Sequence, residues 1–518
     1  MPGTRDENEF PRLIFNSDGD STTLMQFTPP ITQEQACRAV EEIVGTEVDV
    51  FTNSMGRGDD TFSHPTEFGE VYGEGVTEWP QEKGLEGIRV AAENTRALLD
   101  AGIDIVELLA ARAHKRGFQF WPALRMNDIH EDDSARFATR RSSFKKEHQE
   151  LLIGSPYPTR HGYGYPYDDF TWAFDYAKKE VRDRKLGLIL ETCGKYDVDG
   201  FEMDFQRGAW YFKERQEEAG LAMMTDFMRR VRAGTRDISE KRGRQFRLMV
   251  RVPPTIAKCL DVGLDVPTWI KEELADLFIL MDKDYLDMGA DVRGLVALAK
   301  STSCKIGGGL EHSVKGYGHA GADTLYAGAL SYWRQGASCI YLFNYDCHRE
   351  LGGALPYTPE EVQVLREIHD PNVISRRNKR YCVTVDAYSR LPEEGGTMPL
   401  PYLLRQAGDG AAFTIWVGDD LESARRDGVL DEVWLRLMYG SYDTDMLNAT
   451  VSLNGRQLPS GHRAQTSEST TVTYSDVPAV FGENEVAVKL KDGEPSALRI
   501  NGVELMITYG GPWAEDPS

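Results

Sequence analysis

Short apolar runs alternate with amphipathic stretches along the first 370 residues, and no other feature constrains the fold as strongly. We interpret the apolar runs as strands, at residues 12–20, 48–54, 118–128, 197–205, 245–254, 275–285, 304–313 and 338–346. The stretches that follow them are predicted to be helices, at about 33–44, 87–116, 172–194, 216–241, 266–274, 290–300, 321–336 and 358–370. Eight strand–helix units in succession are typical of an α/β protein with a closed parallel (β/α)8 barrel of the TIM type.

Nearly every predicted strand ends in polar residues, which favours a barrel over an open doubly wound sheet. An open sheet needs the same alternation, but it does not need such strand ends. In a barrel the loops at the carboxyl ends of the strands converge on one mouth, where the chemistry lies. The long loops at 55–86 and 129–170 are expected to form walls above that mouth.

The pattern changes after about residue 375. Short runs of alternating apolar and polar residues follow one another, separated by turn signals such as Asn454-Gly455 and Asn501-Gly502. No helix-length periodicity interrupts them. We therefore predict two domains, a catalytic barrel at residues 10–372 and an antiparallel β-sandwich accessory domain at residues 378–512.

Two acids interrupt the fourth predicted strand and are the strongest sign of a functional site. Within the stretch 197–210, Glu202 and Asp204 lie two residues apart, so both side chains point to the same face of the strand. A buried carboxylate without a partner costs several kcal/mol, so two of them at the end of one strand indicate a working site. The alternative is structural, with Glu202 as a paired core acid and Asp204 as the cap of the next helix. Asp419 and Asp420, in the second domain, are expected to be ordinary turn residues.

The charge balance limits the kind of partner. A net charge of -23 and a pI near 5.0 argue against nucleic acid and other polyanions, and a neutral or cationic small molecule fits better. No window approaches the roughly 18 apolar residues of a membrane span, so no membrane partner is expected. Self-association into a homo-oligomer stays compatible with the sequence.

The N-terminus and the cysteines predict a cytoplasmic protein. The first residues lack the charged and apolar blocks of a signal peptide, although a chain whose leader had been removed would look the same. The seven cysteines are odd in number and have no metal-like spacing, which is typical of reduced thiols.

The strand ends together resemble those of a known group of enzymes. The stretches that carry the likeness are VDGFEMDFQR (198–207), LFILMD (277–282), GGGLEH (307–312) and NYD (344–346). They are similar to glycoside-hydrolase-type (β/α)8 barrels, specifically the "family 10-like" glycosyl hydrolase-like proteins, and a β-sandwich often ends such enzymes. VDGFEMD is similar to the DG-x-x-x-D strand-four signature of several retaining glycosidase families, in which the last aspartate, here Asp204, is catalytic. The chain departs from the clan that has an Asn-Glu pair on strand four, because Met203-Asp204 stands there.

The resemblance implies cleavage of a glycosidic bond in an oligosaccharide or glycoside. This chemistry needs two carboxyl groups, roughly 5–5.5 Å apart for retention and 6.5–9.5 Å apart for inversion. Asp204 is our first choice for one of them, as nucleophile or as acid, with Glu311 or Asp282 as its partner. We favour Glu311 slightly, because the seventh strand faces the fourth across the mouth and the triple glycine before it lets a substrate approach the backbone. The alternative is that these glycines only relieve crowding in the barrel.

Other polar residues at the strand ends are candidate sugar-binding groups, because their side chains make short, directional hydrogen bonds. They are Asp18, Asn53, Arg125, Asn127, Glu202, Arg207, Arg251, His312, Asn344, Tyr345 and Asp346. Arg125, Arg207 and Arg251 together could form a cluster that recognises an anionic group such as a carboxylate or sulfate. Glu202, one layer deeper, fits a charge partner of Arg125 or Arg251 better than a catalyst. Aromatic side chains that would stack on sugar faces are Trp121, Trp210, Tyr163, Tyr165 and Tyr345.

Two other classes of function compete with this hypothesis. A metal-dependent hydrolase or lyase would need hard oxygen ligands for Mg²⁺ or Ca²⁺. The acids available for that role are Asp18, Asp20, Asp204, Asp282 and Asp346. A carbohydrate-binding barrel that has lost catalysis is the second rival. No HxH, HExxH or Walker motif occurs, and the favoured hypothesis includes no cofactor and no metal.

Overall fold

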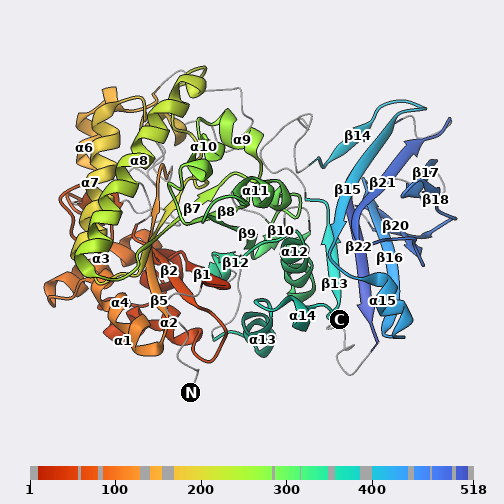
Figure 1. Ribbon diagram of the computed structural model, residues 1–518, viewed down its shortest axis with the longest axis horizontal. Helices are drawn as coiled ribbons and strands as arrows, with labels where there is room; N and C mark the ends of the chain where they lie inside the picture. Colours follow the sequence, from red (N-terminus) through yellow and green to blue (C-terminus); the bar gives the residue numbers. More distant parts are fainter. Residues whose placement is uncertain are drawn as a thin grey trace.

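The structure is a computed structural model that places a barrel ringed by helices beside a second group of strands (Figure 1). It describes residues 10–56, 60–76, 78–79, 86–128, 141–154, 169–282, 286–314, 317–347, 356–384, 399–440, 448–466, 469–492 and 497–510.

Eight parallel strands close into a barrel, as the sequence predicts. In chain order they are β1 (Leu13–Ser17), β2 (Val50–Ser54), β5 (Gln119–Arg125), β6 (Gly200–Asp204), β7 (Arg247–Val252), β8 (Leu277–Leu280), β9 (Lys305–Glu311) and β12 (Cys339–Phe343). Around the ring the order is β1-β12-β9-β8-β7-β6-β5-β2. Because β1 pairs with both β2 and β12, the sheet has no open edge.

Helices follow the strands and cover the outside of the barrel (Figure 1). They are α1 (Gln33–Ala36), α2 (Arg38–Glu42), α3 (Glu86–Asp100), α4 (Ile105–Arg116), α7 (Lys179–Lys195), α8 (Glu217–Arg242), α9 (Ile256–Asp261), α10 (Val266–Lys271), α11 (Val292–Ala299), α12 (Ala322–Arg334), α13 (Pro359–Glu367) and α14 (Pro371–Ile374). The predicted helix at 87–116 is two helices, because Gly102 has a φ of 74° and Asp104 caps a new helix. The capping box of Thr358 and Glu361 at the start of α13 is confirmed.

The predicted helix at 172–194 begins later than expected. The chain there first forms an isolated bridge between Leu152 and Phe174, and α7 starts only at Lys179. Two parts of the segment between β5 and α7 are therefore paired with each other before the helix begins.

Alternate residues of each strand point into the barrel, and their side chains fill it. This interior cluster consists of Ile14, Val50, Trp121, Met249, Leu277, Ile279, Met281, Cys339, Tyr341 and Phe343. Intervening positions such as Phe15, Phe51 and Met203 join the core between the strands and the helices. At the amino end of the barrel, the guanidinium of Arg247 lies 4.8 Å from the ring centre of Phe10. The interior is packed rather than open, so ligands have to bind at a strand end.

Two antiparallel sheets form the C-terminal part of the chain, as predicted. Their strands are β13 (Lys379–Cys382), β14 (Tyr402–Leu404), β15 (Gly410–Val417), β16 (Leu430–Tyr439), β17 (Ala449–Leu453), β18 (Arg456–Gln457), β19 (His462–Gln465), β20 (Thr470–Ser475), β21 (Gly482–Leu490) and β22 (Leu498–Tyr509). One sheet has the order β13-β22-β16-β20-β19, with β14 paired to β22, and the other has the order β15-β21-β17-β18. Side chains such as Leu435, Val486 and Ile500 are fully buried between them, which makes a sandwich-like domain.

Two details of this domain differ from the sequence analysis. Asn454-Gly455 makes the expected turn, with φ values of 52° and 74°, but Asn501-Gly502 lies inside β22. A Cβ on Gly502 would lie 2.1 Å from Cε of Met438, so this glycine serves close packing and not a turn. A short helix, α15 (Leu421–Arg426), also interrupts the strands.

Asp419 is a core residue, so its prediction as a turn residue is wrong. Its carboxylate accepts hydrogen bonds from the hydroxyls of Tyr381, at 2.7 Å, and Tyr509, and it lies 2.9 Å from Nζ of Lys379. We refer to Lys379, Tyr381, Asp419 and Tyr509 as the Asp419 cluster. Asp420 is the N-cap of α15.

The C-terminal sheets pack against the barrel through α12 and β13 (Figure 1). The guanidinium of Arg380 donates to the hydroxyl of Thr324 at 3.0 Å across this junction. The boundaries at 10–372 and 378–512 stay a prediction. Within the described residues, no helix has both the length and the apolar character that crossing a bilayer requires.

Candidate active site at the barrel mouth

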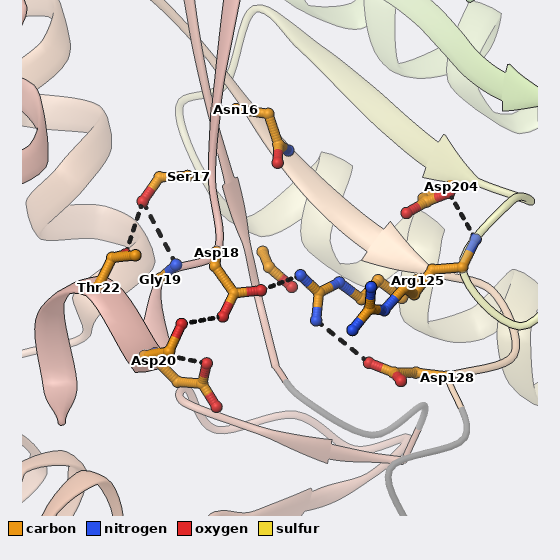
Figure 2. Close-up of polar contacts among 12 residues, drawn as sticks. Asn16, Ser17, Asp18, Gly19, Asp20, Thr22, Arg125, Asp128 and Asp204 are labelled. Atoms are coloured by element: carbon orange, nitrogen blue, oxygen red, sulfur yellow. Dashed lines mark hydrogen bonds and ion pairs between the residues drawn. The ribbon is translucent and has the colours of Figure 1, made fainter. Parts of the chain in front are cut away.

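Asp204 ends β6, and Figure 2 shows it at the strand end near Arg125. Its carboxylate accepts hydrogen bonds from the side chain of Arg251 and from two backbone amides. Arg251, in register beside it on β7, donates from Nε to Oδ1 at 2.8 Å and from Nη2 to Oδ2 at 2.9 Å. The amides of Gln206 and Arg207 donate to Oδ1 at 2.9 and 3.0 Å. Asp204 does not cap a helix, because α8 begins only at Glu217. These donors stabilise the charged carboxylate and fix its position.

Arg251 reaches across the mouth from β7 toward β12. Its guanidinium carbon lies 3.8 Å from the ring centre of Phe343. Burial acts to lower the pKa of Arg251, but the carboxylate of Asp204 outweighs it, so the pKa is raised and the arginine stays charged. Arg251 and Asp204 therefore form a buried ion pair that is covered by an aromatic ring.

Glu202 lies one inward position below Asp204 and is fully buried. Its Oε1 accepts from the hydroxyl of Tyr341 at 2.6 Å, and its Oε2 accepts from Nδ2 of Asn16 at 3.3 Å. Burial and the nearby charge of Asp204 raise the pKa of Glu202 to about 7. The positive charge of Arg251 acts in the opposite direction and lowers that pKa. Glu202 lies too deep for the sugar contact that the sequence analysis predicts.

Arg125 ends β5 and pairs with two other acids (Figure 2). Its guanidinium forms an ion pair with Asp18, and its Nη1 lies 3.4 Å from Oδ2 of Asp128. Burial acts to lower the pKa of Arg125, but the two carboxylates have the larger combined effect. The pKa is therefore raised, and the residue stays charged. Gly19, with a φ of 80°, turns the chain directly after Asp18. The hydrogen bonds of Arg125 go to these acids, so the predicted pairing with Glu202 is wrong.

Arg125, Arg207 and Arg251 do not form a positively charged site that is free of nearby carboxylates. Arg125 and Arg251 are each offset by carboxylates. Arg207 is 9% exposed, and its charge acts against the protonation of Arg125. The predicted recognition of an anionic substrate therefore gains no support from Arg125 or Arg251.

Glu311 ends β9 in register with Phe343 of β12. Its side chain is 2% exposed, and Oε1 contacts Nδ1 of His312. The amide of His312 donates to the same oxygen at 3.2 Å. The ring of Phe343, the register neighbour of Glu311, also covers the guanidinium of Arg251. His312, predicted as a sugar-binding residue, contacts the carboxyl group of Glu311 instead.

Asp282 follows β8 on the side away from the barrel interior. Its neighbour Met281 belongs to the interior cluster, whereas Oδ2 of Asp282 lies 4.0 Å from Nζ of Lys258 on α9. The backbone oxygen of Asp282 accepts from Arg251 at 3.4 Å. The carboxyl group thus faces the helix layer.

The triple glycine before Glu311 makes room for neighbouring side chains. A Cβ on Gly307 would lie 2.5 Å from Sγ of Cys339, and one on Gly308 would lie 2.1 Å from the ring of Tyr332. Both distances are far below normal contact. Relief of crowding accounts for these glycines, so they no longer favour Glu311 over Asp282.

Two predicted sugar-binding residues have their side chains committed elsewhere. The carboxamide of Asn127 donates to the carbonyls of Phe174, at 3.0 Å, and Trp210, and it accepts from the amide of Phe174 at 2.9 Å. Asn53 donates to the carbonyl of Ser54 at 2.9 Å. Asn127 is a structural link between two loops at the mouth.

Tyr345 turns away from the mouth. Asn344 has a left-handed backbone, with a φ of 49°, so the alternation of β12 breaks after Phe343. The hydroxyl of Tyr345 then donates to the carbonyl of Glu361 on α13 at 3.0 Å. The predicted stacking of Tyr345 on a sugar is therefore wrong.

Two of the other aromatic residues named from the sequence, Trp121 and Trp210, are buried and are not exposed platforms. Trp121 belongs to the interior cluster and Trp210 is 2% exposed. Tyr163 and Tyr165 lie outside the described residues.

Three buried carboxamides near the strand ends have polar atoms without a hydrogen-bond partner among the described residues. They are Oδ1 of Asn16, Oδ1 of Asn344, and both polar atoms of Gln206. A buried polar atom without a partner is costly, so such atoms indicate where water or a ligand binds. Of these three residues, only Asn344 is among the sugar-binding candidates named from the sequence. Asn16 and Gln206 could have been found, because both lie within two residues of a predicted acidic strand end.

The acids proposed as metal ligands bind other groups. Their partners are Arg125 for Asp18, Ser21 for Asp20, Arg251 for Asp204, Lys258 for Asp282 and Ser17 for Asp346. Over the stretches that the structure describes, no three His, Cys, Asp or Glu side chains are arranged to hold a metal ion. The metal-dependent alternative thus has no supporting geometry in these stretches.

No family model matches the chain, and no curated protein matches it. Among solved structures, the chain is similar to the glycoside hydrolase domain of PgaB (BpsB) from Bordetella bronchiseptica, with a TM-score of 0.44 and 11% identity over 70% of this chain and 99% of that one. It is similar to a maltogenic alpha-amylase, AmyB from Thermotoga neapolitana, with a TM-score of 0.38 and 10% identity over 96% of this chain and 99% of that one.

A third similar structure is the GH36 alpha-galactosidase AgaA from Geobacillus stearothermophilus, with a TM-score of 0.38 and 13% identity over 93% of this chain. The match covers 56% of that protein, so this chain spans little more than half of its length. These three neighbours are glycoside hydrolases. The likeness is too distant to carry an argument about activity, and the "family 10-like" assignment stays a prediction.

Proposed function

We propose that the chain is a glycoside hydrolase that cleaves a glycosidic bond of an oligosaccharide or glycoside with two carboxyl groups at the barrel mouth. Two carboxyl groups at the carboxyl ends of barrel strands carry the proposal. Asp204 ends β6 and is paired with Arg251, and Glu311 ends β9. Glycosidic cleavage needs two carboxyl groups that flank the scissile bond. Barrel enzymes hold their reacting groups at this end of the strands.

The surroundings of the two carboxyl groups support different roles. Arg251 and two backbone amides donate to the carboxyl group of Asp204 and hold it in one position, which suits a nucleophile or a base. Glu311 contacts the imidazole of His312, which can exchange a proton with it, and this suits the group that protonates the leaving oxygen. Asp282 fits that second role less well, because its carboxyl group faces Lys258.

Each role corresponds to a defined step. In a retaining reaction, Asp204 attacks the anomeric carbon while Glu311 gives its proton to the leaving oxygen. Glu311 then takes a proton from water, and the water releases the sugar from Asp204. In an inverting reaction, Asp204 instead takes the proton of the attacking water.

Buried carboxamides support the binding of a polyhydroxylated substrate. Gln206 and Asn344 follow β6 and β12 at the mouth and have spare hydrogen-bonding atoms. A carboxamide both donates and accepts, as sugar hydroxyls do. These two residues are the best candidates for substrate contacts.

A second candidate function is a barrel that binds carbohydrate without cleaving it. The observation that favours it is the burial of the carboxyl groups, because Asp204 is 1% exposed and Glu311 is 2% exposed.

Hydrolysis of a panel of aryl glycosides and oligosaccharides separates the two candidates. The wild-type chain should turn over at least one member, and Asp204→Ala should lose at least about 10³-fold in kcat. Azide should restore part of the turnover of Asp204→Ala in a retaining enzyme, because the small anion fits the space that the carboxylate leaves. Circular dichroism checks that the variant folds.

The opposite outcome supports the binding barrel. In that case calorimetry detects an oligosaccharide bound to the wild-type chain, no member of the panel is hydrolysed, and Asp204→Asn binds with the same affinity.

A further inference from the structure

The loop that leaves the mouth after β9 forms a small hairpin. It begins at Glu311, and β10 (Ser313–Val314) pairs antiparallel with β11 (Gly318–His319). The amide of Ala320 donates to the carbonyl of His312 at 2.8 Å, which closes the hairpin directly beside Glu311. A ladder of two-residue strands is marginally stable alone, so its order depends on what it packs against.

Tyr317, in the turn of this hairpin, places its hydroxyl between two strands of the sandwich-like domain. The hydroxyl donates to the carbonyl of Val383 at 2.8 Å and accepts from the amide of Val503 at 2.9 Å. A Cβ on Gly502 would lie 3.2 Å from the hydroxyl, so the glycine permits this close approach. Burial raises the pKa of Tyr317 well above its usual value, which keeps the hydroxyl protonated as a donor.

The loop after β8 is tied to the same two partners. The amide of Leu286 donates to the carbonyl of Ser313 in the hairpin at 2.8 Å. The carbonyl of Leu286 accepts from the hydroxyl of Thr384, which follows β13, at 2.9 Å. The sandwich-like domain therefore contacts both loops that follow β8 and β9.

We infer that the C-terminal domain is a positioning element of the barrel mouth: through Tyr317 and Thr384 it fixes the hairpin that continues from Glu311. Tyr317 is a positioning residue, because its hydroxyl bonds to Val383 and Val503 and it acts on the site through the hairpin. The effect on turnover rests on the proposed function. The effect on the order of the hairpin does not.

Tyr317→Phe tests the inference, because it removes the hydroxyl and keeps the ring. Hydrogen–deuterium exchange of the amides at 311–320 should become about tenfold faster, since the hairpin opens more often when these bonds are lost. On a hydrolysed substrate, kcat should fall about fivefold with little change in KM, and the pH profile should shift because His312 and Glu311 move relative to each other.

Arg293→Ala is the matched control. It breaks another contact between the domains, where Nη2 of Arg293 lies 2.6 Å from Oε1 of Glu483. Both side chains are exposed, and neither belongs to the loops after β8 and β9. This variant should leave the exchange at 311–320, kcat and the pH profile unchanged.

Unchanged exchange at 311–320 in Tyr317→Phe overturns the inference, and so does equal acceleration in Arg293→Ala. If Tyr317→Phe does not fold, Thr384→Val replaces it, and unchanged exchange around Leu286 and at 311–320 has the same meaning. A wild-type chain that hydrolyses no glycoside, together with faster hairpin exchange in Tyr317→Phe, refutes the proposed function and leaves the inference standing.

Discussion

Two buried ion pairs, one in each part of the molecule, look alike and differ in what surrounds them. At the barrel mouth, Arg251 lies 2.8 Å from Asp204, and in the C-terminal domain Lys379 lies 2.9 Å from Asp419. All four side chains are at most 2% exposed. Each pair has lost its hydration, so each depends on the hydrogen bonds that its surroundings supply.

The Asp419 cluster is a closed network. The hydroxyl of Tyr381 donates to Asp419 at 2.7 Å and accepts from the amide of Gly418 at 3.0 Å. Lys379 also donates to the carbonyl of Arg377 at 2.7 Å. Each of these buried polar side chains has a hydrogen-bond partner among the described residues, as a structural ion pair requires.

The barrel mouth has unused hydrogen-bonding atoms beside its ion pair. Gln206 and Asn344 have buried polar atoms without partners among the described residues, and Glu202 has its pKa raised to about 7. A perturbed carboxyl group together with unused donors and acceptors is typical of a functional site. The comparison teaches that burial of charge alone does not distinguish a site from a structural cluster.

The largest expected effect comes from removing each cation in turn. Arg251→Met and Lys379→Met both leave a buried carboxylate without its partner, so each should lower the free energy of unfolding by about 3–5 kcal/mol. Arg251→Met should also lower kcat at least about 100-fold, because Asp204 is no longer held in place. Lys379→Met should leave the kcat of the folded protein almost unchanged. Urea unfolding and steady-state kinetics measure both, and equal losses of kcat would contradict the comparison.

Glu202→Gln should change how stability depends on pH. The pKa of Glu202 is raised from its usual value of 4.5 to about 7, so the folded protein binds the proton more tightly than the unfolded chain. Its contribution is present below about pH 4.5 and is lost as pH rises through about 7, by up to about 3 kcal/mol. Glu202→Gln should lack this decline. Urea unfolding between pH 4 and 8 measures it, and the same slope in both proteins would contradict the assignment.

Gly307→Ala separates packing from substrate access. The added Cβ would lie 2.5 Å from Sγ of Cys339, so the variant should lose about 1–2 kcal/mol of stability. KM should stay unchanged, because relief of crowding explains the glycine. Thermal unfolding measures the loss of stability, and steady-state kinetics measures KM. A raised KM with unchanged stability would instead support the hypothesis that the substrate approaches the backbone at Gly307.

The smallest effect is expected at the other end of β6. Nε2 of His114 lies 2.7 Å from Oδ2 of Asp199, and this hydrogen bond raises the pKa of His114. The contribution is fully present below the unfolded pKa and is lost as pH rises through the higher folded pKa. Because the histidine is partly exposed, the loss should stay below about 1 kcal/mol. His114→Gln should remove this pH dependence without changing kcat, and any fall in kcat would contradict a purely structural role.

The sequence predicts the barrel well because strand and helix periodicities are local. The alternation also places Glu202 and Asp204 on one face, since two-residue spacing fixes it. The same local pattern predicts the C-terminal sheets. The helix at 87–116 is mispredicted because the break at Gly102 depends on a single backbone angle.

The partners of the polar side chains could not be predicted, because they come from distant parts of the chain. Arg125 binds Asp18, which lies 107 residues away, and Asn127 binds the loop at Phe174 and Trp210. Tyr345 leaves the mouth because of one left-handed residue before it. Residue type identifies polar side chains at the strand ends, and long-range contacts determine which of them are engaged by other parts of the chain.

The central claim is that Glu311, and not Asp282, acts with Asp204. The most direct measurement compares kcat of Glu311→Gln and Asp282→Asn on an unactivated glycoside and on one with an acidic aryl leaving group. Glu311→Gln should lose about 10²–10⁴-fold on the first substrate and far less on the second, which needs no proton, while Asp282→Asn stays within about tenfold of wild type on both. The reverse pattern, with the leaving-group dependence in Asp282→Asn and near-normal turnover in Glu311→Gln, would contradict the account.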